Sequence, residues 1–289
     1  MTGAAGMLGV AVRTELARSN HTVTATGQSG QEGLVPMDIR DWGQVRHCIR
    51  EQQPEVVLHL AAETDVDRCE QQPDHAFATN ALGTENLAWA CREQDAILVY
   101  ISTANVFDGE KPEPYTEYDR TGSINVYGRS KLAGEHAVER AQGRHFILRA
   151  GWMVGGWEID KKFVYKIVQR CRSESQLKVV EDKFGSPTFT VDFARQLMPL
   201  VQTGRYGIYH LANQGVASRL EIAREVVQLL GKEQEVEICP VSSAEFPLPA
   251  PRPRSEMLRN LKLELIGMNH MPHWKASLRR YIEENRDRA

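Results

Sequence analysis

The sequence predicts an α/β fold: a doubly wound parallel sheet with a smaller C-terminal α/β unit. Two observations lead to this class. Over the first 150 residues, apolar strand-like runs alternate with segments of helical spacing, as in βαβ units. Two of the runs, residues 54–62 and 96–103, are continuously apolar, which is typical of strands buried on both faces of a parallel sheet. After residue 151 the alternation becomes less regular.

The composition is that of an ordinary soluble protein. The 289 residues are 42% hydrophobic and 25% charged, with a formal net charge of −3, so neither nucleic acid nor a membrane surface is an expected partner. Five dispersed cysteines contain no CxxC pair, which argues against a disulfide framework or a zinc site. We therefore expect free, buried or half-buried thiols, no metal, and a cytoplasmic location. No apolar run approaches the ~20 residues of a membrane span, and no secretory signal precedes the first motif.

The chain opens with a glycine-rich segment, Thr2-Gly3-Ala4-Ala5-Gly6-Met7-Leu8-Gly9. In a dinucleotide-binding turn, Gly3 would permit the tight turn, Gly6 would let the backbone approach a pyrophosphate, and Gly9 would let the helix pack closely on the sheet. Met7 and Leu8 would then begin the helix whose N-terminus faces the anion. The strand that normally precedes such a turn is missing, so we expect a truncated or misassigned start and lower stability.

Helix-like spacing follows over residues 7–17, and a β-branched run over residues 21–26 predicts a strand. That run ends without the acidic residue that would bind the ribose 2′-hydroxyl of NAD and repel the 2′-phosphate of NADP. The sequence therefore allows NADP as the cofactor but does not require it. Asp38 could accept a hydrogen bond from an adenine amino group while Ile39 packs on the ring. Alternatively, Asp38 caps the helix expected over residues 42–51.

The end of the apolar strand 54–62 supplies further cofactor candidates. Ala61 and Ala62 are small enough to admit a cofactor ribose, and Thr64 follows in the crevice where doubly wound sheets bind ligands. Val66 lies in the same crevice and is a candidate for substrate binding. Asn80, on the helix expected over residues 73–92, is interpreted as a bridge between neighbouring loops.

The central motif is Tyr127-Gly128-Arg129-Ser130-Lys131. A tyrosine and a lysine four residues apart on a helix lie on the same face. The lysine would lower the tyrosine pKa from its ordinary value of about 10 and hold the nicotinamide ribose. Thr103, which follows Ser102 at the end of the strand 96–103, would polarise a carbonyl. Together these residues predict carbonyl reduction, with Tyr127 donating the proton and a bound nicotinamide the hydride.

The chain resembles the dTDP-4-dehydrorhamnose reductase family of extended short-chain dehydrogenase/reductases, nearly end to end. The matching segments are AAETDVD (61–67), VFDG (106–109), INVYGRSKLAGE (124–135), FGSPTFTVD (184–192), YHLAN (209–213) and RPRSEMLRN (252–260). The resemblance implies reduction of the 4-keto group of dTDP-4-dehydro-L-rhamnose to give dTDP-L-rhamnose, with NADPH as cofactor and NADH as an alternative. It implies Thr103, Tyr127 and Lys131 as catalytic residues, of which Tyr127 and Lys131 also bind the cofactor, and Trp152 as a substrate contact.

The sequence departs from this family pattern at the expected sugar pocket. Ala104 and Asn105 stand where the family has aspartate and tyrosine, and Glu256 stands where it has serine. We still expect Ala104 and Asn105 to border the substrate. Glu256 would repel a diphosphate if it faced one, and would have no consequence if it pointed to solvent. Arg252 could bind a diphosphate, although a surface ion pair explains it equally well.

Residues 1–151 are accordingly predicted to form an NAD(P)-binding Rossmann domain, to which residues 184–213 return. Residues 152–183 and 214–289 would form a substrate-binding domain. Two other functions remain open: an epimerase or dehydratase that retains its NAD, and a non-catalytic nucleotide-binding regulatory subunit. The non-acidic Ala104 and Asn105 argue against a dehydratase. Retention of Thr103, Tyr127 and Lys131 argues against the regulatory subunit. A homodimer also remains open.

Overall fold

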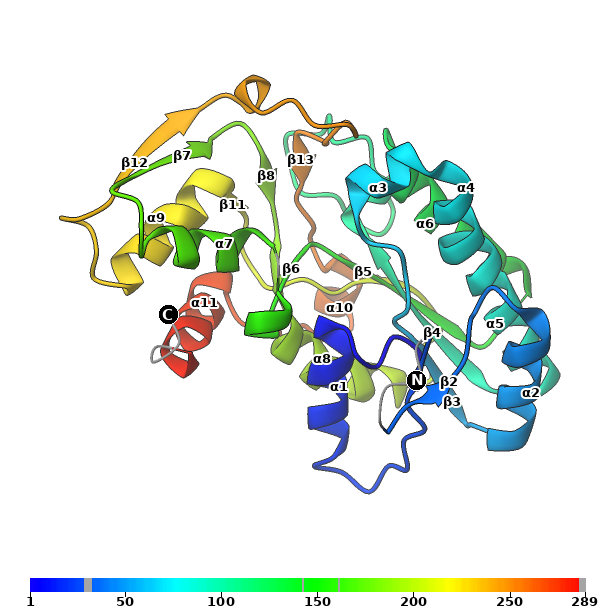
Figure 1. The fold of residues 1–289 in the computed structure, drawn as a ribbon. Helices are drawn as coiled ribbons and strands as arrows, with labels where there is room; N and C mark the ends of the chain where they lie inside the picture. The colour runs from blue at the N-terminus through cyan, green and yellow to red at the C-terminus, as the bar shows by residue number, and fades with distance from the viewer. Residues whose placement is uncertain (29–32, 142, 161, 286–289) are drawn as a thin grey trace.

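The protein is organised around a parallel sheet, shown in Figure 1. The computed structural model describes residues 1–28, 33–141, 143–160 and 162–285. In spatial order the strands are β10 (Gly207–His210), β5 (His145–Ala150), β4 (Ile97–Thr103) and β3 (Val56–His59), and every neighbouring pair is parallel. This arrangement confirms the predicted parallel sheet.

The sheet continues past β3 through the first residues of the chain. Thr2 forms a parallel bridge with His59, and its backbone N–H donates to the carbonyl of Leu58 over 2.9 Å. On the other side, Met1 accepts from the backbone N–H of β1 (Thr26–Gly27), which pairs in parallel with β2, Val35–Pro36. Residues 1 and 2 therefore lie where the first strand was expected. The strand predicted for residues 21–26 is reduced to the short β1.

Helices cover both faces of the sheet. They are α1 (Met7–Leu16) and α8 (Thr190–Val201) on one face, and α2 (Trp42–Gln52), α5 (Gly83–Glu93) and α6 (Val126–Ala141) on the other. Alternate strand residues face the two layers: Val99 and Phe146 pack with α1 and α8, whereas Leu98 and Ile147 pack with α2, α5 and α6. Burial on both faces explains why these strands are continuously apolar, and it confirms the doubly wound class.

One long helical segment follows β3 and α3 (Val66–Gln71) and contains a local irregularity. It consists of α4 (Pro73–Phe77), the π-helical turn η1 (Ala78–Leu82) and α5. Asn80 lies in this turn, is fully buried, and donates to the carbonyl of Glu63 and to Ser130 Oγ, each over 3.0 Å. The predicted bridging role of Asn80 is confirmed.

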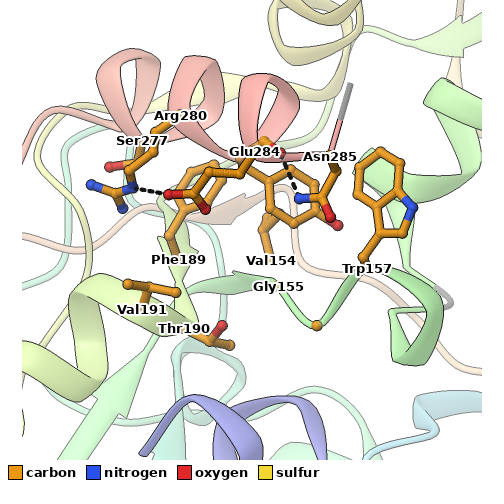
Figure 2. A pocket seen from close by; sticks show the side chains of 12 residues that line it. Val154, Gly155, Trp157, Phe189, Thr190, Val191, Ser277, Arg280, Glu284 and Asn285 are labelled. Atoms are coloured by element: carbon orange, nitrogen blue, oxygen red, sulfur yellow. Dashed lines mark hydrogen bonds and ion pairs between the residues drawn. The ribbon is translucent and has the colours of Figure 1, made fainter. Parts of the chain in front are cut away.

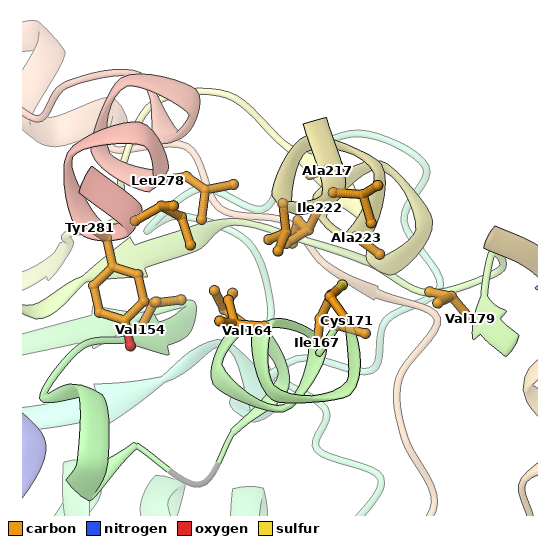
Figure 3. Close-up of a cluster of buried hydrophobic side chains, with 14 of the residues drawn as sticks. Val154, Val164, Ile167, Cys171, Val179, Ala217, Ile222, Ala223, Leu278 and Tyr281 are labelled. Carbon is orange, nitrogen blue, oxygen red and sulfur yellow. The ribbon is translucent and has the colours of Figure 1, made fainter. Parts of the chain in front are cut away.

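A second layered unit stands beside the sheet. It contains the parallel pair β7 (Gln176–Val180) and β12 (Glu237–Val241), with α7 (Phe163–Arg170), α9 (Arg219–Leu229) and α11 (Trp274–Glu284). These helices enclose the hydrophobic cluster of Figure 3, in which Trp274 is buried. Ser218 and Glu221 form the capping box at the start of α9 that their spacing indicates.

Short segments connect the two units. β6 (Trp152–Val154) pairs with β9 (Pro187–Phe189), while β8 (Phe184–Gly185) lies between β11 (Ala217–Ser218) and β13 (Ser255–Glu256). The remaining elements are η2 (Ala104–Val106), η3 (Trp157–Ile159), η4 (Ser243–Glu245) and α10 (Leu261–Leu265). In the chain, α8 and β10 lie between segments of the second unit, yet α8 covers the parallel sheet and β10 is one of its strands. From later in the chain, α10 also packs with the sheet. The exact domain boundaries stay a prediction.

The five cysteines are free thiols, buried at Cys69, Cys91 and Cys171 and half-buried at Cys48 and Cys239, as predicted. Among the described helices, none combines the length and apolar character needed to cross a bilayer.

A buried ion pair joins α6 to the middle of the sheet. Arg149 on β5 donates to both carboxylate oxygens of Glu135 over 2.9 and 2.6 Å, with side-chain exposures of 4% and 1%. Ser102 Oγ on β4 donates to the same carboxylate over 2.5 Å. Three elements thus meet at one desolvated charge cluster, in which the Arg149 guanidinium also lies 5.2 Å from the Phe107 ring centroid.

Arg149→Met should lower the free energy of unfolding by about 3–5 kcal/mol, because it leaves the Glu135 carboxylate buried without its partner. The matched control is Arg170→Met, which removes an exposed pair with Glu174 and should change stability by less than about 1 kcal/mol. Urea unfolding followed by circular dichroism measures both. Equal effects of the two variants would contradict the role of the buried pair.

Candidate active site

The glycine-rich turn lies against the carboxyl end of β3. Gly3 has a φ of +64°, and a Cβ at this position would lie 2.6 Å from the backbone nitrogen of Ala61. The tight turn predicted for Gly3 is therefore confirmed. A Cβ at Gly9 would lie 2.3 Å from the Gly3 carbonyl oxygen. Gly9 thus lets the helix approach the turn itself, whereas the prediction had it packing on the sheet.

The start of α1 presents backbone donors. Gly6 is its N-cap, and within the described residues no side chain caps this end and no acid occupies its first turn. The backbone N–H groups of Met7, Leu8 and Gly9 are thus among the first-turn donors that an intrahelical bond does not satisfy. Together with the helix dipole they suit an anion. The segment therefore fits the pyrophosphate of a dinucleotide, the group for which these residues were predicted.

Asp38 does not cap a helix. The cap of α2 is Asp41, which accepts from the backbone N–H of Gln44 over 3.1 Å. Asp38 instead accepts from the Arg40 guanidinium, which lowers the pKa of this carboxyl to about 2. The capping alternative is wrong, and Asp38 remains an ionised acceptor beside a cation that the sequence reading overlooked. Its role toward adenine stays a prediction.

The remaining predicted cofactor residues are Ile39, Ala61, Ala62 and Thr64. Ile39 is buried in the core and fills the space that a Cβ at Gly83 would need, 2.8 Å from its side chain. The side chain that was expected to contact adenine therefore packs against Gly83 of α5. Ala61 and Ala62 are half-buried just beyond β3, and Thr64 is exposed. Their contacts with a cofactor stay predictions.

The three predicted catalytic residues come together. Tyr127 and Lys131 lie one turn apart on α6, and the Tyr127 phenol lies close enough to Thr103, at the end of β4, for the Thr103 side chain to act on its pKa. Burial raises the pKa of Tyr127 above its ordinary value, and the smaller effect of Thr103 acts in the opposite direction. The predicted lowering of this pKa by Lys131 is therefore wrong for this arrangement, because desolvation of the phenolate outweighs nearby donors. A phenol with a raised pKa keeps the proton that a general acid must donate.

Lys131 is itself strongly desolvated. Its side chain is buried, the residue being 3% exposed, and Nζ lies 4.1 Å from the ring centroid of Tyr100. Burial lowers the pKa of Lys131 to about 7, although the carboxylate of Glu135 acts in the opposite direction. The aromatic face replaces part of the hydration that the ammonium loses. Lys131 is therefore poised between its charged and neutral forms near neutral pH.

Ser102 and Thr103 diverge because consecutive strand residues point to opposite faces. Ser102 faces α6 and bonds to Glu135, as described above, so it belongs to the structural ion pair. Thr103 Oγ1 accepts from the backbone N–H of Asn105 over 3.1 Å and faces Tyr127. Gly128 permits this approach, since a Cβ there would lie 2.0 Å from the carbonyl oxygen of Asn105.

The predicted substrate side of the site contains a polar network. Glu256 accepts from Asn105 Nδ2 over 2.5 Å and from Trp152 Nε1 over 2.9 Å. The guanidinium of Arg219 stacks 3.5 Å from the centroid of the Trp152 ring. Glu256 therefore points neither to solvent nor away from the site, and Arg219 was not among the predicted residues. Its signal in the sequence, an arginine directly after the helix-capping Ser218, was too general to find it.

The other predicted substrate residues have mixed surroundings. Trp152 is 9% exposed and belongs to the hydrophobic cluster, so its indole N–H, rather than an open ring face, reaches the polar network. Ala104 is buried in a small apolar cluster with Phe107. Val66 is half-buried at the start of α3, and Arg252 pairs with Asp67 over 2.9 Å. As substrate contacts these residues stay predictions.

A separate hollow of about 230 Å³ lies between β6, the start of α8 and α11, as shown in Figure 2. Its lining includes Val154, Phe189 and Tyr281, together with the polar Ser277 and Arg280. None of the predicted catalytic residues lines it. Arg280 and Ser277 are bonded to Asp192, so this region is interpreted as structural.

Comparison with known proteins gives a consistent result. The family model described as RmlD substrate binding domain matches residues 1–286. The chain is 37% identical over 280 residues to dTDP-4-dehydrorhamnose reductase of Mycolicibacterium smegmatis, which covers 96% of this chain and 83% of the relative. A dTDP-4-dehydrorhamnose reductase from Clostridium acetobutylicum superposes with a TM-score of 0.93 at 37% identity, covering 99% and 98% of the two chains. The Bacillus anthracis dTDP-4-dehydrorhamnose reductase in complex with NADP gives 0.92 at 34% identity, covering 98% and 97%.

The burial of Lys131 should make stability depend on pH. Between about pH 7 and 10.5 the folded protein binds fewer protons at Lys131 than the unfolded chain, so the wild type gains stability as the pH rises. Lys131→Met removes this dependence. Near pH 6.5 the free energy of unfolding of the variant should exceed that of the wild type by a few kcal/mol, on the order of 1.4 kcal/mol per pKa unit. This difference should shrink toward pH 10.

Urea titrations of the cofactor-free protein at pH 6.5 and 9.5 measure this difference. Lys178→Met is the control, since that side chain is 60% exposed, and its effect should not vary with pH. If the free energies of unfolding of the wild type and of Lys131→Met differ by the same amount at both pH values, the desolvation of Lys131 is refuted.

Gly128→Ala should damage the site despite the higher helix propensity of alanine, which alone would stabilise α6 by about 1 kcal/mol. The added Cβ would meet backbone of the turn after Thr103 and force α6 away from it. We expect a lower melting temperature and at least a roughly tenfold loss of kcat for carbonyl reduction, because small displacements of catalytic groups are costly. Gly143→Ala, where a Cβ meets no described atom within 4 Å, is the control and should be near neutral.

Proposed function

Because the chain belongs to the RmlD substrate binding domain family, we propose that it is an NADPH-dependent sugar-nucleotide reductase. Its substrate would be a dTDP-linked 4-keto-6-deoxyhexose, with dTDP-4-dehydro-L-rhamnose converted to dTDP-L-rhamnose. Support comes from relatives named dTDP-4-dehydrorhamnose reductase and from one such structure in complex with NADP. The five free thiols favour a cytoplasmic location.

The observation that carries this proposal is the meeting of Thr103 and Tyr127 one helical turn from Lys131. Bound NADPH would supply hydride to the carbonyl carbon. Tyr127, kept protonated by its raised pKa, donates its proton to the carbonyl oxygen as negative charge develops there. Thr103 orients the phenol and can itself donate to that oxygen.

Of the two tasks predicted for Lys131, binding the nicotinamide ribose is kept and direct action on Tyr127 is not. Its Nζ is held over Tyr100, so in this arrangement it does not stabilise the Tyr127 phenolate directly. Lys131 would hold the ribose of the nicotinamide, and its lowered pKa lets it exchange a proton near neutral pH. The backbone donors at the start of α1 would hold the pyrophosphate.

The purified protein should oxidise NADPH stoichiometrically when it is given dTDP-4-dehydro-L-rhamnose. Absorbance at the nicotinamide band and chromatography of the product measure consumption of cofactor and formation of dTDP-L-rhamnose. Product formation without net cofactor consumption would instead indicate an epimerase or dehydratase. Cofactor binding without turnover on dTDP-, GDP- or UDP-linked keto-sugars would indicate a regulatory subunit.

Tyr127→Phe should lower kcat about 10²- to 10⁴-fold, the usual contribution of a general acid, because the proton donor is lost. The ring remains, so the Kd for NADPH, measured by fluorescence titration, should stay within about twofold. Tyr118→Phe is the matched control, since that side chain is 69% exposed, and should leave kcat unchanged. An unaltered kcat in Tyr127→Phe would remove Tyr127 as the acid.

A further inference from the structure

Glu256 is held in one orientation at the predicted sugar pocket. It lies on β13, opposite Gly185 of β8, and its side chain is half-buried. One carboxylate oxygen accepts from Trp152 Nε1 over 2.9 Å, and the other accepts from Asn105 Nδ2 over 2.5 Å. A carboxylate held at both oxygens by donors from two other segments has little rotamer freedom left. Each oxygen still has capacity to accept a further hydrogen bond.

A cation lies close to Glu256. Arg219 is stacked on the Trp152 ring, and burial lowers the pKa of this guanidinium to about 10 while the Glu256 carboxylate acts in the opposite direction. The packing of Trp152 on Gly185 fixes the indole, since a Cβ at Gly185 would lie 2.5 Å from the ring. The Glu256 carboxylate thus belongs to a polar network in which Trp152 is itself held in place by packing.

This network is continuous with the reacting groups. Asn105, which donates to Glu256, also donates its backbone N–H to Thr103 Oγ1. The start of α6 packs on the same residue, since a Cβ at Gly128, next to Tyr127, would lie 2.0 Å from the Asn105 carbonyl oxygen. The negative charge of Glu256 contributes to raising the pKa of Tyr127, so the carboxylate and the phenol share one environment. A carbonyl positioned to receive the Tyr127 proton would therefore place neighbouring ring carbons toward Glu256.

We propose that Glu256 is a specificity-determining residue that accepts a hydrogen bond from a sugar-ring hydroxyl close to the reacting carbonyl, an inference that rests on the proposed function. A hydroxyl can donate to the free acceptor sites, whereas a diphosphate would be repelled by the carboxylate. Glu256 thus contacts the sugar ring, and the diphosphate lies elsewhere. Asn105 and Trp152 act as positioning residues that aim the carboxylate.

A site built to accept from a substrate hydroxyl discriminates strongly against an analogue that lacks it, because the buried acceptor is then left unpaired. The wild type should therefore lose at least about 100-fold in kcat/KM on either the 2-deoxy or the 3-deoxy analogue of dTDP-4-dehydro-L-rhamnose, relative to the parent. This comparison needs no variant. Values of kcat/KM within about threefold for all three sugars would overturn the proposal.

Glu256→Gln assigns the discrimination to this side chain. The amide loses the charge and presents an N–H group toward donors, so kcat/KM on the parent should fall roughly 10- to 100-fold, as for a charged hydrogen bond. Activity on the sensitive deoxy analogue should change less than about threefold, so that the discrimination collapses. Equal losses on parent and analogue would overturn the proposal, because a purely structural role would affect both.

Glu245→Gln is the matched control, since Glu245 is exposed in η4 and pairs with Lys178 on the surface, and it should leave the discrimination intact. If Glu256→Gln does not fold, judged by its melting curve, the wild-type comparison alone decides. A wild type that oxidises no NADPH with the parent sugar refutes the proposed function and this role with it. Turnover of the parent without discrimination refutes the role of Glu256 alone.

Discussion

The bidentate ion pair between Arg149 and Glu135 is the interaction on which the site depends. It fixes α6 to β5 in the interior of the protein, and Ser102 brings β4 into the same contact. Tyr127 and Lys131 are carried by this helix, and Thr103 is the residue after Ser102. One charge cluster therefore ties the helix that carries Tyr127 and Lys131 to the strand that ends at Thr103. Such a pair contributes geometry more than net stability, since its desolvation is costly.

Desolvation also sets the electrostatics of the site. A tyrosine and a lysine one turn apart suggest an ammonium that eases ionisation of the phenol. In the folded protein the two side chains lie in different surroundings: Lys131 on the face of Tyr100, and Tyr127 against Thr103. Burial consequently dominates both pKa values, raising that of Tyr127 and lowering that of Lys131. Each shift keeps the neutral form accessible, which suits a dry site for proton transfer.

Much of the fold could be predicted from the sequence, because the sheet and its helices are long enough to show their periodicity. The helix of Tyr127, the strand ending at Thr103 and the turn at Gly3 are examples. The two-residue strands β8, β11 and β13 are too short to leave a pattern, and they are the elements that bring residue 256 to the site. Their pairing is a property of the tertiary structure.

Side-chain direction was the other missing information. Ser102 and Thr103 are adjacent in the chain, yet Ser102 bonds to Glu135 in the middle of α6, whereas Thr103 lies near Tyr127 at the start of that helix. Ile39 was predicted as an adenine contact, and the sequence did not show that its side chain also packs against Gly83 of α5. The polar network around Glu256 joins residues more than 100 positions apart, a distance over which local propensity carries no information.

The order of strands in the sheet has a consequence for the biosynthesis of the chain. β5 is flanked by β10, yet β10 leaves the ribosome some 57 residues later, after α7, β7 and α8 have been made. Until then the nascent sheet exposes one edge of β5, with the apolar Phe146 and Leu148 uncovered on the face that α8 later shields. An unpaired hydrophobic edge is a template for intermolecular pairing. The interval before β10 emerges is thus one in which nascent chains of this protein carry an unpaired, aggregation-prone strand edge.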